Sequence, residues 1–225
     1  MESCRLNNAE SIDECVKESV QILRAGGVLL YPTDTLYGLG ADALSDEAVD
    51  KVYAIKGRDE QKPIHAMFAD LAMVEKYAEV PGMASMLAKA FLPGALTLIL
   101  KKRTGVETGL ARGIQTIGIR IPKSAFCLAL AKEFGGPFTA TSANKSGSKT
   151  ERSTNTILVQ LNRAEAYTSV LQKTAITNID LVIDAEELPE RQPTTVVDLS
   201  GKEPIILREG AVSPAEIWNA IRTEP

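Results

Sequence analysis

The stretch that decides the fold is Gly27-Val28-Leu29-Leu30-Tyr31-Pro32-Thr33-Asp34-Thr35-Leu36-Tyr37-Gly38-Leu39-Gly40. It begins with a short apolar run that a proline closes, a pattern that predicts a buried strand. The residues that follow are polar and rich in glycine. We therefore expect a loop over 32–40 at the carboxyl end of this strand, where open α/β sheets bind their ligands.

Amphipathic helices flank this strand and loop. Ser11 and Glu14 form a capping box ahead of apolar residues at helical spacing, and Ser45 caps a second helix that ends near Gly57. Beyond it, strands are expected at 64–68, 96–100, 117–121, 138–141, 181–183, 196–199 and 205–207, and helices after Asp70 and over 81–91, 124–134 and 213–222. The alternation predicts one α/β domain over 1–225, built on a mixed sheet, with its core over about 12–210.

Composition narrows the function classes. The 225 residues include 25 Lys plus Arg and 29 Asp plus Glu, a net charge of −4, which argues against a wholly basic nucleic-acid binder but leaves room for one basic groove. The longest apolar runs are only strand-sized, so no membrane span is expected. The N-terminus has no basic start and apolar core, and we expect a cytoplasmic protein.

Cysteine and histidine offer little material for catalysis. Cys4, Cys15 and Cys127 are odd in number and lack CxxC spacing, so reduced thiols are expected, with no zinc cluster. His65 is the single histidine, which excludes a multi-histidine metal site, and its apolar strand favours a structural role over that of a base. Asp34 either holds its loop by accepting backbone amides or helps to hold Mg²⁺.

Polar clusters at 33–37, 56–62 and 141–147 are interpreted as lying where strands end, and neither a P-loop nor a dinucleotide-binding glycine motif occurs. Arginine and lysine beside strand ends and turns suit carboxylate or phosphate groups. The cations in such positions are Lys56, Arg58, Lys62, Arg120 and Arg208. Together they predict an anionic ligand. The polar segment 148–178, with a helical patch at 157–161, is interpreted as a mobile lid or an insertion.

An ordered series of motifs gives the chain a family resemblance. After the 27–39 stretch come Lys56-Gly57-Arg58, Lys62-Pro63, Pro93-Gly94-Ala95-Leu96-Thr97, Gly118-Ile119-Arg120-Ile121-Pro122, Thr141-Ser142-Ala143-Asn144-Lys145-Ser146-Gly147, Thr194-Thr195-Val196-Val197-Asp198 and Ile206-Leu207-Arg208-Glu209-Gly210. This series resembles the YrdC-type threonylcarbamoyl-AMP synthases, over roughly 26–210. The combination of KxR with SxN is its most specific part.

The resemblance implies a twisted mixed sheet flanked by helices, with a concave, positively charged cavity. It implies an enzyme of the short form, without the extra C-terminal domain of longer members. The implied reaction joins L-threonine, bicarbonate and ATP, with Mg²⁺, and releases pyrophosphate. The product, threonylcarbamoyl-AMP, would pass to the threonylcarbamoyl-transferase system that modifies tRNA.

The resemblance also assigns residues by position. It implies that L-threonine is bound by Thr35, Arg120 and Thr194. It implies that ATP is bound by Arg58, Lys62, Thr116, Ser142, Thr150 and Arg208. The catalytic set that it implies is Lys56, Arg58, Ser142 and Asn144, which need supply only position and charge.

The sequence departs from the family pattern at three places. Met67 stands where many relatives carry a histidine, so that histidine contact is lost or shifted to His65. Thr194-Thr195 replaces Ser-Thr, and Thr150 follows an unusual segment.

One alternative function is a non-catalytic RNA-binding module that uses the same positive cavity, and weak RNA binding by the enzyme also remains open. The other is an enzyme for a different carbamoyl-adenylate, as in hydrogenase maturation.

Overall fold

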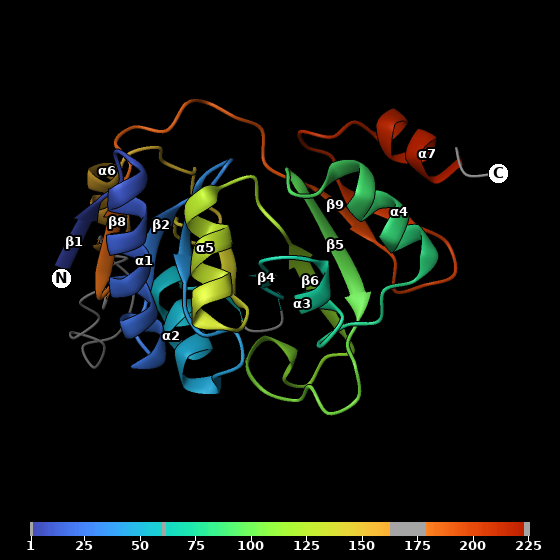
Figure 1. Ribbon diagram of the computed structural model, residues 1–225, viewed down its shortest axis with the longest axis horizontal. Helices are drawn as coiled ribbons and strands as arrows, with labels where there is room; N and C mark the ends of the chain where they lie inside the picture. Colours follow the sequence, from blue (N-terminus) through green and yellow to red (C-terminus); the bar gives the residue numbers. More distant parts are fainter. Residues whose placement is uncertain (1, 60–61, 163–178, 223–225) are drawn as a thin grey trace.

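The computed structural model describes residues 2–59, 62–162 and 179–222. Within those ranges, ten strands form one mixed sheet in the order β1-β8-β2-β3-β7-β4-β6-β5-β9-β10 (Figure 1). The strands are β1 (Glu2–Arg5), β2 (Leu29–Pro32), β3 (Tyr37–Gly40), β4 (His65–Met67), β5 (Leu96–Lys101), β6 (Thr116–Arg120), β7 (Phe138–Ser142), β8 (Leu181–Asp184), β9 (Thr195–Asp198) and β10 (Ile205–Arg208).

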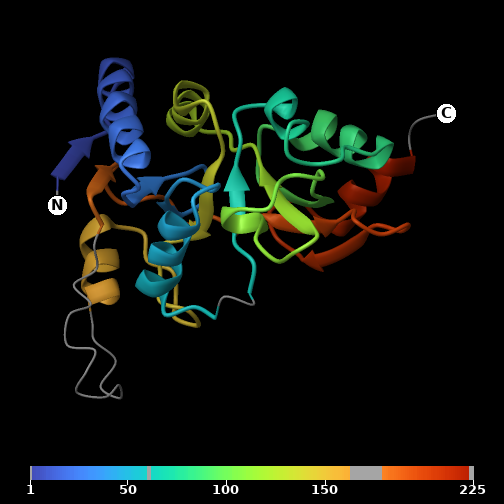
Figure 2. The same ribbon diagram turned by 90° about the horizontal axis from the view of Figure 1, so that it is seen from below.

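The helices are α1 (Ala9–Arg24), α2 (Asp46–Lys56), α3 (Leu71–Val74), α4 (Gly82–Phe91), α5 (Ala125–Phe134), α6 (Thr154–Asn162) and α7 (Pro214–Arg222), with a short 3-10 helix η1 (Gly109–Ala111). Figure 2 shows α1 and α5 on one side of the sheet and α2 and α6 on the other. The twisted mixed sheet with helices on both sides confirms the predicted fold class.

Strand β2 shows why an apolar run without alternation decides the fold. Leu29 and Tyr31 pack into the core under α1 and α5, whereas Val28 and Leu30 pack into the core on the opposite side. Successive side chains of a strand point to opposite faces, so a strand buried on both faces must be apolar throughout.

Helix starts confirm most of the predicted boundaries. The side chains of Ser45, Asp70 and Ser124 each accept the N–H three residues on and cap α2, α3 and α5. The first helix begins earlier than expected, because the Asn8 side chain accepts the Ser11 N–H (2.8 Å) and takes the N-cap position. Within 148–178, residues 154–162 form α6, and the lid or insertion interpretation otherwise concerns 163–178, outside the described residues.

Two expectations are corrected. The 32–40 loop is shorter than predicted, because Tyr37–Gly40 forms β3 in a hairpin with β2. Its glycines are needed there, since a Cβ at Gly38 or Gly40 would lie 3.0 Å from the Tyr31 ring. The N-terminal thiols are not both reduced: the unforeseen strand β1 brings Cys4 within a Cα–Cα distance of 5.6 Å of Cys15 on α1, and the two form a disulfide.

No helix in the described part of the chain is long and apolar enough to cross a membrane.

Candidate functional site

A turn after β2 starts the candidate site. The Thr33 hydroxyl oxygen accepts the N–H groups of Thr35 (3.0 Å) and Leu36 (3.1 Å), while the Thr33 N–H donates to the Leu36 carbonyl (3.1 Å). This threonine-capped turn lets the chain reverse into β3 within four residues. It places Thr35, only 4% exposed, at the wall of a cavity.

The cavity has a volume of about 360 Å³ and lies where β2, β3, β4, β5, β6 and β7 meet the residues that flank β9. Its polar side chains carry hydroxyls, guanidinium groups and the imidazole of His65, and none of its described lining residues is Asp or Glu. Four arginines line it: Arg58, Arg120, Arg191 and Arg208. Such a lining favours an anionic ligand.

A buried lysine organises one wall. Lys56, at the end of α2, is 1% exposed, and its ammonium group donates to the Ser142 carbonyl, to the Asn144 carbonyl (2.9 Å) and to Asn144 Oδ1 (3.1 Å). The Ser142 hydroxyl donates to the same Oδ1 (2.6 Å), and Asn144 Nδ2 donates to the Ser148 carbonyl (2.6 Å). The ammonium group has three N–H donors and three acceptors around it, so Lys56 shapes the 142–148 turn from behind.

Burial, with the charge of Arg58 second, lowers the pKa of Lys56 to about 7. The three oxygen acceptors favour the protonated form. Arg58 itself lines the cavity and is held by the Lys62 carbonyl at Nε (3.0 Å) and the Pro63 carbonyl at Nη2 (3.2 Å). These contacts fix the direction of the Arg58 guanidinium.

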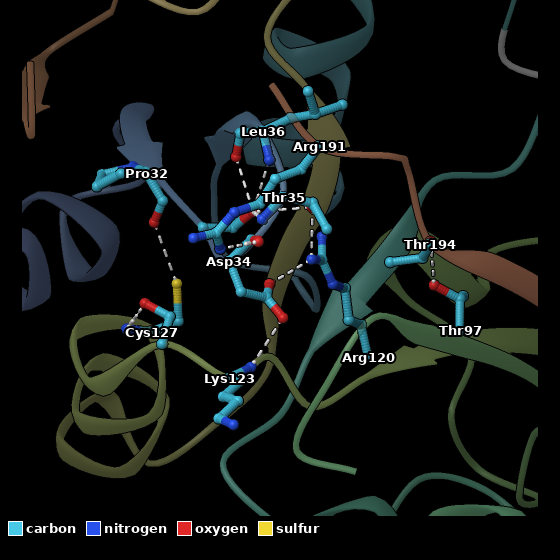
Figure 3. Close-up of polar contacts among 12 residues, drawn as sticks. Pro32, Asp34, Thr35, Leu36, Thr97, Arg120, Lys123, Cys127, Arg191 and Thr194 are labelled. Carbon is cyan, nitrogen blue, oxygen red and sulfur yellow. Dashed lines mark hydrogen bonds and ion pairs between the residues drawn. The ribbon is translucent and has the colours of Figure 1, made fainter. Parts of the chain in front are cut away.

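Arg120 extends from the end of β6 (Figure 3). Its Nη2 donates to the Asp34 carboxylate and to the Thr35 hydroxyl (2.7 Å), and the side chains of Arg120 and Asp34 are 11% and 7% exposed. The Asp34 carboxylate also accepts the Lys123 N–H (3.0 Å), which agrees with the loop-holding interpretation of Asp34. Nη1 of Arg120 has no hydrogen-bond partner within the described ranges and remains available to a ligand.

Arg208, at the end of β10, binds Thr194. Its Nε donates to the Thr194 carbonyl (3.0 Å), and Nη2 donates to both that carbonyl (2.8 Å) and the Thr194 hydroxyl (2.8 Å). The Thr194 hydroxyl also shares a hydrogen bond of 2.9 Å with that of Thr97, which is fully buried on β5 (Figure 3). Burial, with the charge of Arg120 second, lowers the pKa of Arg208.

Strand β4 contributes both His65 and Met67 to the lining, because residues two apart share one face of a strand. The His65 ring occupies the space above Gly118, where a Cβ would lie 2.3 Å from the ring. Burial, followed by the charges of Arg208, Arg58 and Arg120, lowers the pKa of His65 to about 4. Its imidazole is therefore neutral near pH 7. Met67, which pairs in register with Arg120, presents a thioether without charge.

The structure brings together most of the residues that the sequence singled out. Those that line the cavity are Thr35, Arg58, Arg120, Ser142, Thr150, Thr194 and Arg208. Lys56 and Asn144 lie directly behind this lining, and Lys62 sits beside it, holding Arg58 through its carbonyl. Thr116 lies outside the lining, because it opens β6, four residues or roughly 13 Å from Arg120 at the far end of that strand.

Sequence reasoning missed several lining residues. Arg191 sits in an irregular segment without a motif, and Thr97 lies inside a quoted motif but had no assigned role. His65, expected to be structural, also faces the cavity. The alternation of β4, which places His65 and Met67 on one face, is the signal that would have found it.

Neither a reactive thiol nor a metal cluster is evident in the residues described. Cys127, which donates to the Pro32 carbonyl (3.4 Å), is fully buried, and this burial raises the pKa of its thiol to about 12. Groups of three or more His, Cys, Asp or Glu side chains that could hold a metal ion do not occur within 2–59, 62–162 and 179–222. The site therefore offers positioned donors and positive charge.

Comparisons with known proteins agree with this geometry. Residues 21–210 match the Sua5/YciO/YrdC family model, described as "Telomere recombination". The chain is 33% identical over 218 residues to the threonylcarbamoyl-AMP synthase of Pyrococcus abyssi, covering 96% of this chain and 60% of that protein. It is 31% identical over 207 residues to the threonylcarbamoyl-AMP synthase of Bacillus subtilis, covering 91% of this chain and 56% of that protein.

Among solved structures, the chain resembles P. abyssi Sua5 complexed with L-threonine. The TM-score is 0.83 at 31% identity, over 98% of this chain and 60% of that one. The chain thus spans a little over half the length of these relatives.

Proposed function

Because this chain belongs to the Sua5/YciO/YrdC family, we propose that it is an L-threonylcarbamoyladenylate synthase, which makes threonylcarbamoyl-AMP and pyrophosphate from L-threonine, bicarbonate and ATP. The observation that carries the proposal is the cavity itself, which is lined by four arginines and by Ser142 from the turn that Lys56 holds. Two relatives named threonylcarbamoyl-AMP synthase and a related structure complexed with L-threonine support it.

Threonine would bind at the wall formed by Thr35, Arg120 and Thr194. Nη1 of Arg120 and the Thr35 hydroxyl would meet its carboxylate, since Nη2 of Arg120 is already bound to Asp34. Thr194, whose hydroxyl sits between Thr97 and Arg208, would meet the other polar groups of the amino acid. A pocket that hydrogen-bonds a substrate hydroxyl discriminates strongly against analogues that lack it.

ATP would occupy the part of the cavity near Arg58, Ser142, Thr150 and Arg208. Arginine forks match phosphate oxygens, and the Ser142 and Thr150 hydroxyls add donors. Lys62 would contribute by fixing Arg58 through its carbonyl. Thr116, which opens β6 and is not among the lining residues, stays a proposed contact for a part of ATP that extends beyond the cavity.

The chemistry needs position and charge more than a nucleophilic side chain. The threonine amine, after loss of a proton, attacks the carbon of bicarbonate and forms a carbamate with loss of water. A carbamate oxygen then attacks the α-phosphorus of ATP, and the bond to the β-phosphate oxygen breaks to release pyrophosphate. Guanidinium groups held in advance by Asp34, Thr194 and the Lys62 carbonyl stabilise the charge that moves between these groups.

Magnesium fits this proposal as a companion of ATP. The described residues offer no carboxylate cluster for it, so we propose that the phosphate oxygens of ATP carry the ion. When bound, Mg²⁺ neutralises phosphate charge. The residues of this chain supply the remaining positive charge.

The product would be consumed by a threonylcarbamoyl-transferase system that acts on tRNA, in the cytoplasm. A mixed anhydride of a carbamate and a phosphate is activated for such a transfer. The observations above do not favour the RNA-binding alternative over the enzyme.

The test is pyrophosphate release by the purified chain with ATP, Mg²⁺ and bicarbonate, comparing L-threonine, L-serine and no amino acid. We expect release that depends on threonine and falls at least tenfold in Arg58→Ala and in Arg120→Ala. Release that is indifferent to threonine and bicarbonate would contradict the proposal. The exposed cation Lys202, on the turn between β9 and β10, gives a matched control as Lys202→Ala.

A further inference from the structure

Residues 185–194, here called the strap, connect two distant strands. β8 and β9 are seven positions apart in the sheet, a separation of roughly 34 Å at ~4.8 Å per strand. The eleven steps from Asp184 to Thr195 reach at most about 36–40 Å when fully extended. The strap therefore crosses the sheet with little length to spare, and Figure 1 shows it in orange, arching along the top from β8 to β9.

Hydrogen bonds hold the strap at both ends. On the β8 side, the Tyr37 hydroxyl donates to the Glu186 carbonyl (2.9 Å) and accepts the Ala185 N–H (2.9 Å), and the Leu188 N–H donates to the Arg152 carbonyl (3.0 Å). On the β9 side, the Pro193 carbonyl accepts the Ala211 N–H (2.9 Å). A segment that is extended and held at both ends delivers its central residues to a defined place.

Arg191 is the residue delivered to the cavity. Its Nη1 donates to the Asp34 carbonyl (2.7 Å), while the Asp34 carboxylate holds Arg120. One residue thus lies between two guanidinium groups, one from the strap and one from the sheet (Figure 3). Within 2–59, 62–162 and 179–222, Arg191 has no carboxylate partner, and a guanidinium has five N–H donors, so most of its donors remain free at the cavity wall.

We propose that Arg191 is a second arginine for the carboxylate of the amino-acid substrate, which it would bind from the strap while Arg120 binds it from the sheet. The inference rests on the proposed function and deepens it. The shared anchor Asp34 places Arg191 beside Arg120 and Thr35, the residues that we assign to threonine, and within the described ranges the hydrogen bond of its side chain is to Asp34. Two guanidinium groups on one carboxylate give stronger, charge-assisted hydrogen bonds and a fixed orientation.

Isothermal titration calorimetry with L-threonine and, separately, with the non-hydrolysable ATP analogue AMPCPP tests the inference. The variants are Arg191→Gln, which removes the charge, and Arg191→Lys, which keeps the charge but loses the fork. Lys202→Gln removes an exposed cation outside the cavity and controls for net charge. We expect Arg191→Gln to weaken threonine binding by roughly tenfold or more, with Arg191→Lys intermediate. AMPCPP binding and the melting temperature should stay close to wild type.

Two outcomes would overturn the inference and leave the proposed function intact: wild-type threonine affinity in Arg191→Gln, or an equal loss for threonine and AMPCPP. A lowered melting temperature in both Arg191 variants, with threonine binding weakened equally in both, would likewise show a structural role only. If the wild-type chain failed to bind threonine, the proposed function and the inference would fall together.

Discussion

The ammonium group of Lys56 hydrogen-bonds both the backbone carbonyl (2.9 Å) and the side-chain oxygen (3.1 Å) of Asn144, a residue 88 positions later in the chain. The contact joins the end of α2 to the turn after β7. It explains physically why KxR and SxN are informative as a combination, since the lysine of one motif has its donors satisfied by the other.

Replacing Lys56 with Met should disorder this turn, because the carbonyls of Ser142 and Asn144 would lose the ammonium donor and Asn144 Oδ1 would keep only the Ser142 hydroxyl. We expect the free energy of unfolding to fall by about 1–3 kcal/mol. Threonine-dependent pyrophosphate release should fall far more than stability explains, by roughly a hundredfold. Chemical denaturation and the pyrophosphate assay measure the two effects. Lys51→Met, an exposed lysine on the same helix, is the matched control, and near-normal turnover in Lys56→Met would refute the expectation.

Replacing Thr97 with Val should raise the KM for threonine by roughly threefold to tenfold, with kcat and the KM for ATP little changed. The valine fills the same space but leaves the Thr194 hydroxyl with Arg208 as its protein partner, so its orientation is less defined. Thr195→Val is the control, because the Thr195 hydroxyl is also buried but bonds to Val212 instead of facing the cavity. Equal KM effects in the two variants would rule out a specific role for Thr97.

The low pKa of His65 predicts a pH dependence of stability. Between pH 4 and 6.5 the unfolded chain binds a proton at this site that the folded chain does not, so stability rises with pH across that window and is lost as pH falls through it. From pH 7 to pH 4.5 the contribution is about 2 kcal/mol. Urea unfolding at both pH values should show a smaller difference for His65→Asn than for wild type. Equal differences would mean that burial and the neighbouring arginine charges do not lower the pKa of His65 as described.

The disulfide between Cys4 and Cys15 predicts how many reactive thiols the protein has before and after reduction. Denatured protein without reductant should show one reactive thiol, that of Cys127, and three after reduction. Because the bond closes a loop of about eleven residues, reduction should lower the free energy of unfolding by up to about 3 kcal/mol. Threonine binding should persist, since neither Cys4 nor Cys15 lines the cavity. Three thiols before reduction would show that the bond does not form.

Local sequence patterns were sufficient for most of the fold. Helix-capping side chains such as Ser45, Asp70 and Ser124 act within one helical turn. An apolar run such as 28–31 predicts a strand that is buried on both faces. Strand β3 escaped prediction because its glycines, which usually indicate a loop, are required by the Tyr31 ring packed against them. That requirement comes from a neighbouring strand.

The sequence by itself determined the α/β class, most of the strand and helix positions and, through its ordered motifs, the family, and it predicted an anionic ligand. The tertiary structure alone decided which residues share the cavity. Lys56 lies behind the cavity lining, Thr116 is not part of that lining, and His65 faces the cavity. The connection from β8 to β9 brings Arg191 into contact with Asp34. The physical reason is the distance along the chain over which each kind of interaction acts. Caps and periodicity act over a few residues, whereas strand order and a nearly extended connection bring together groups more than a hundred residues apart.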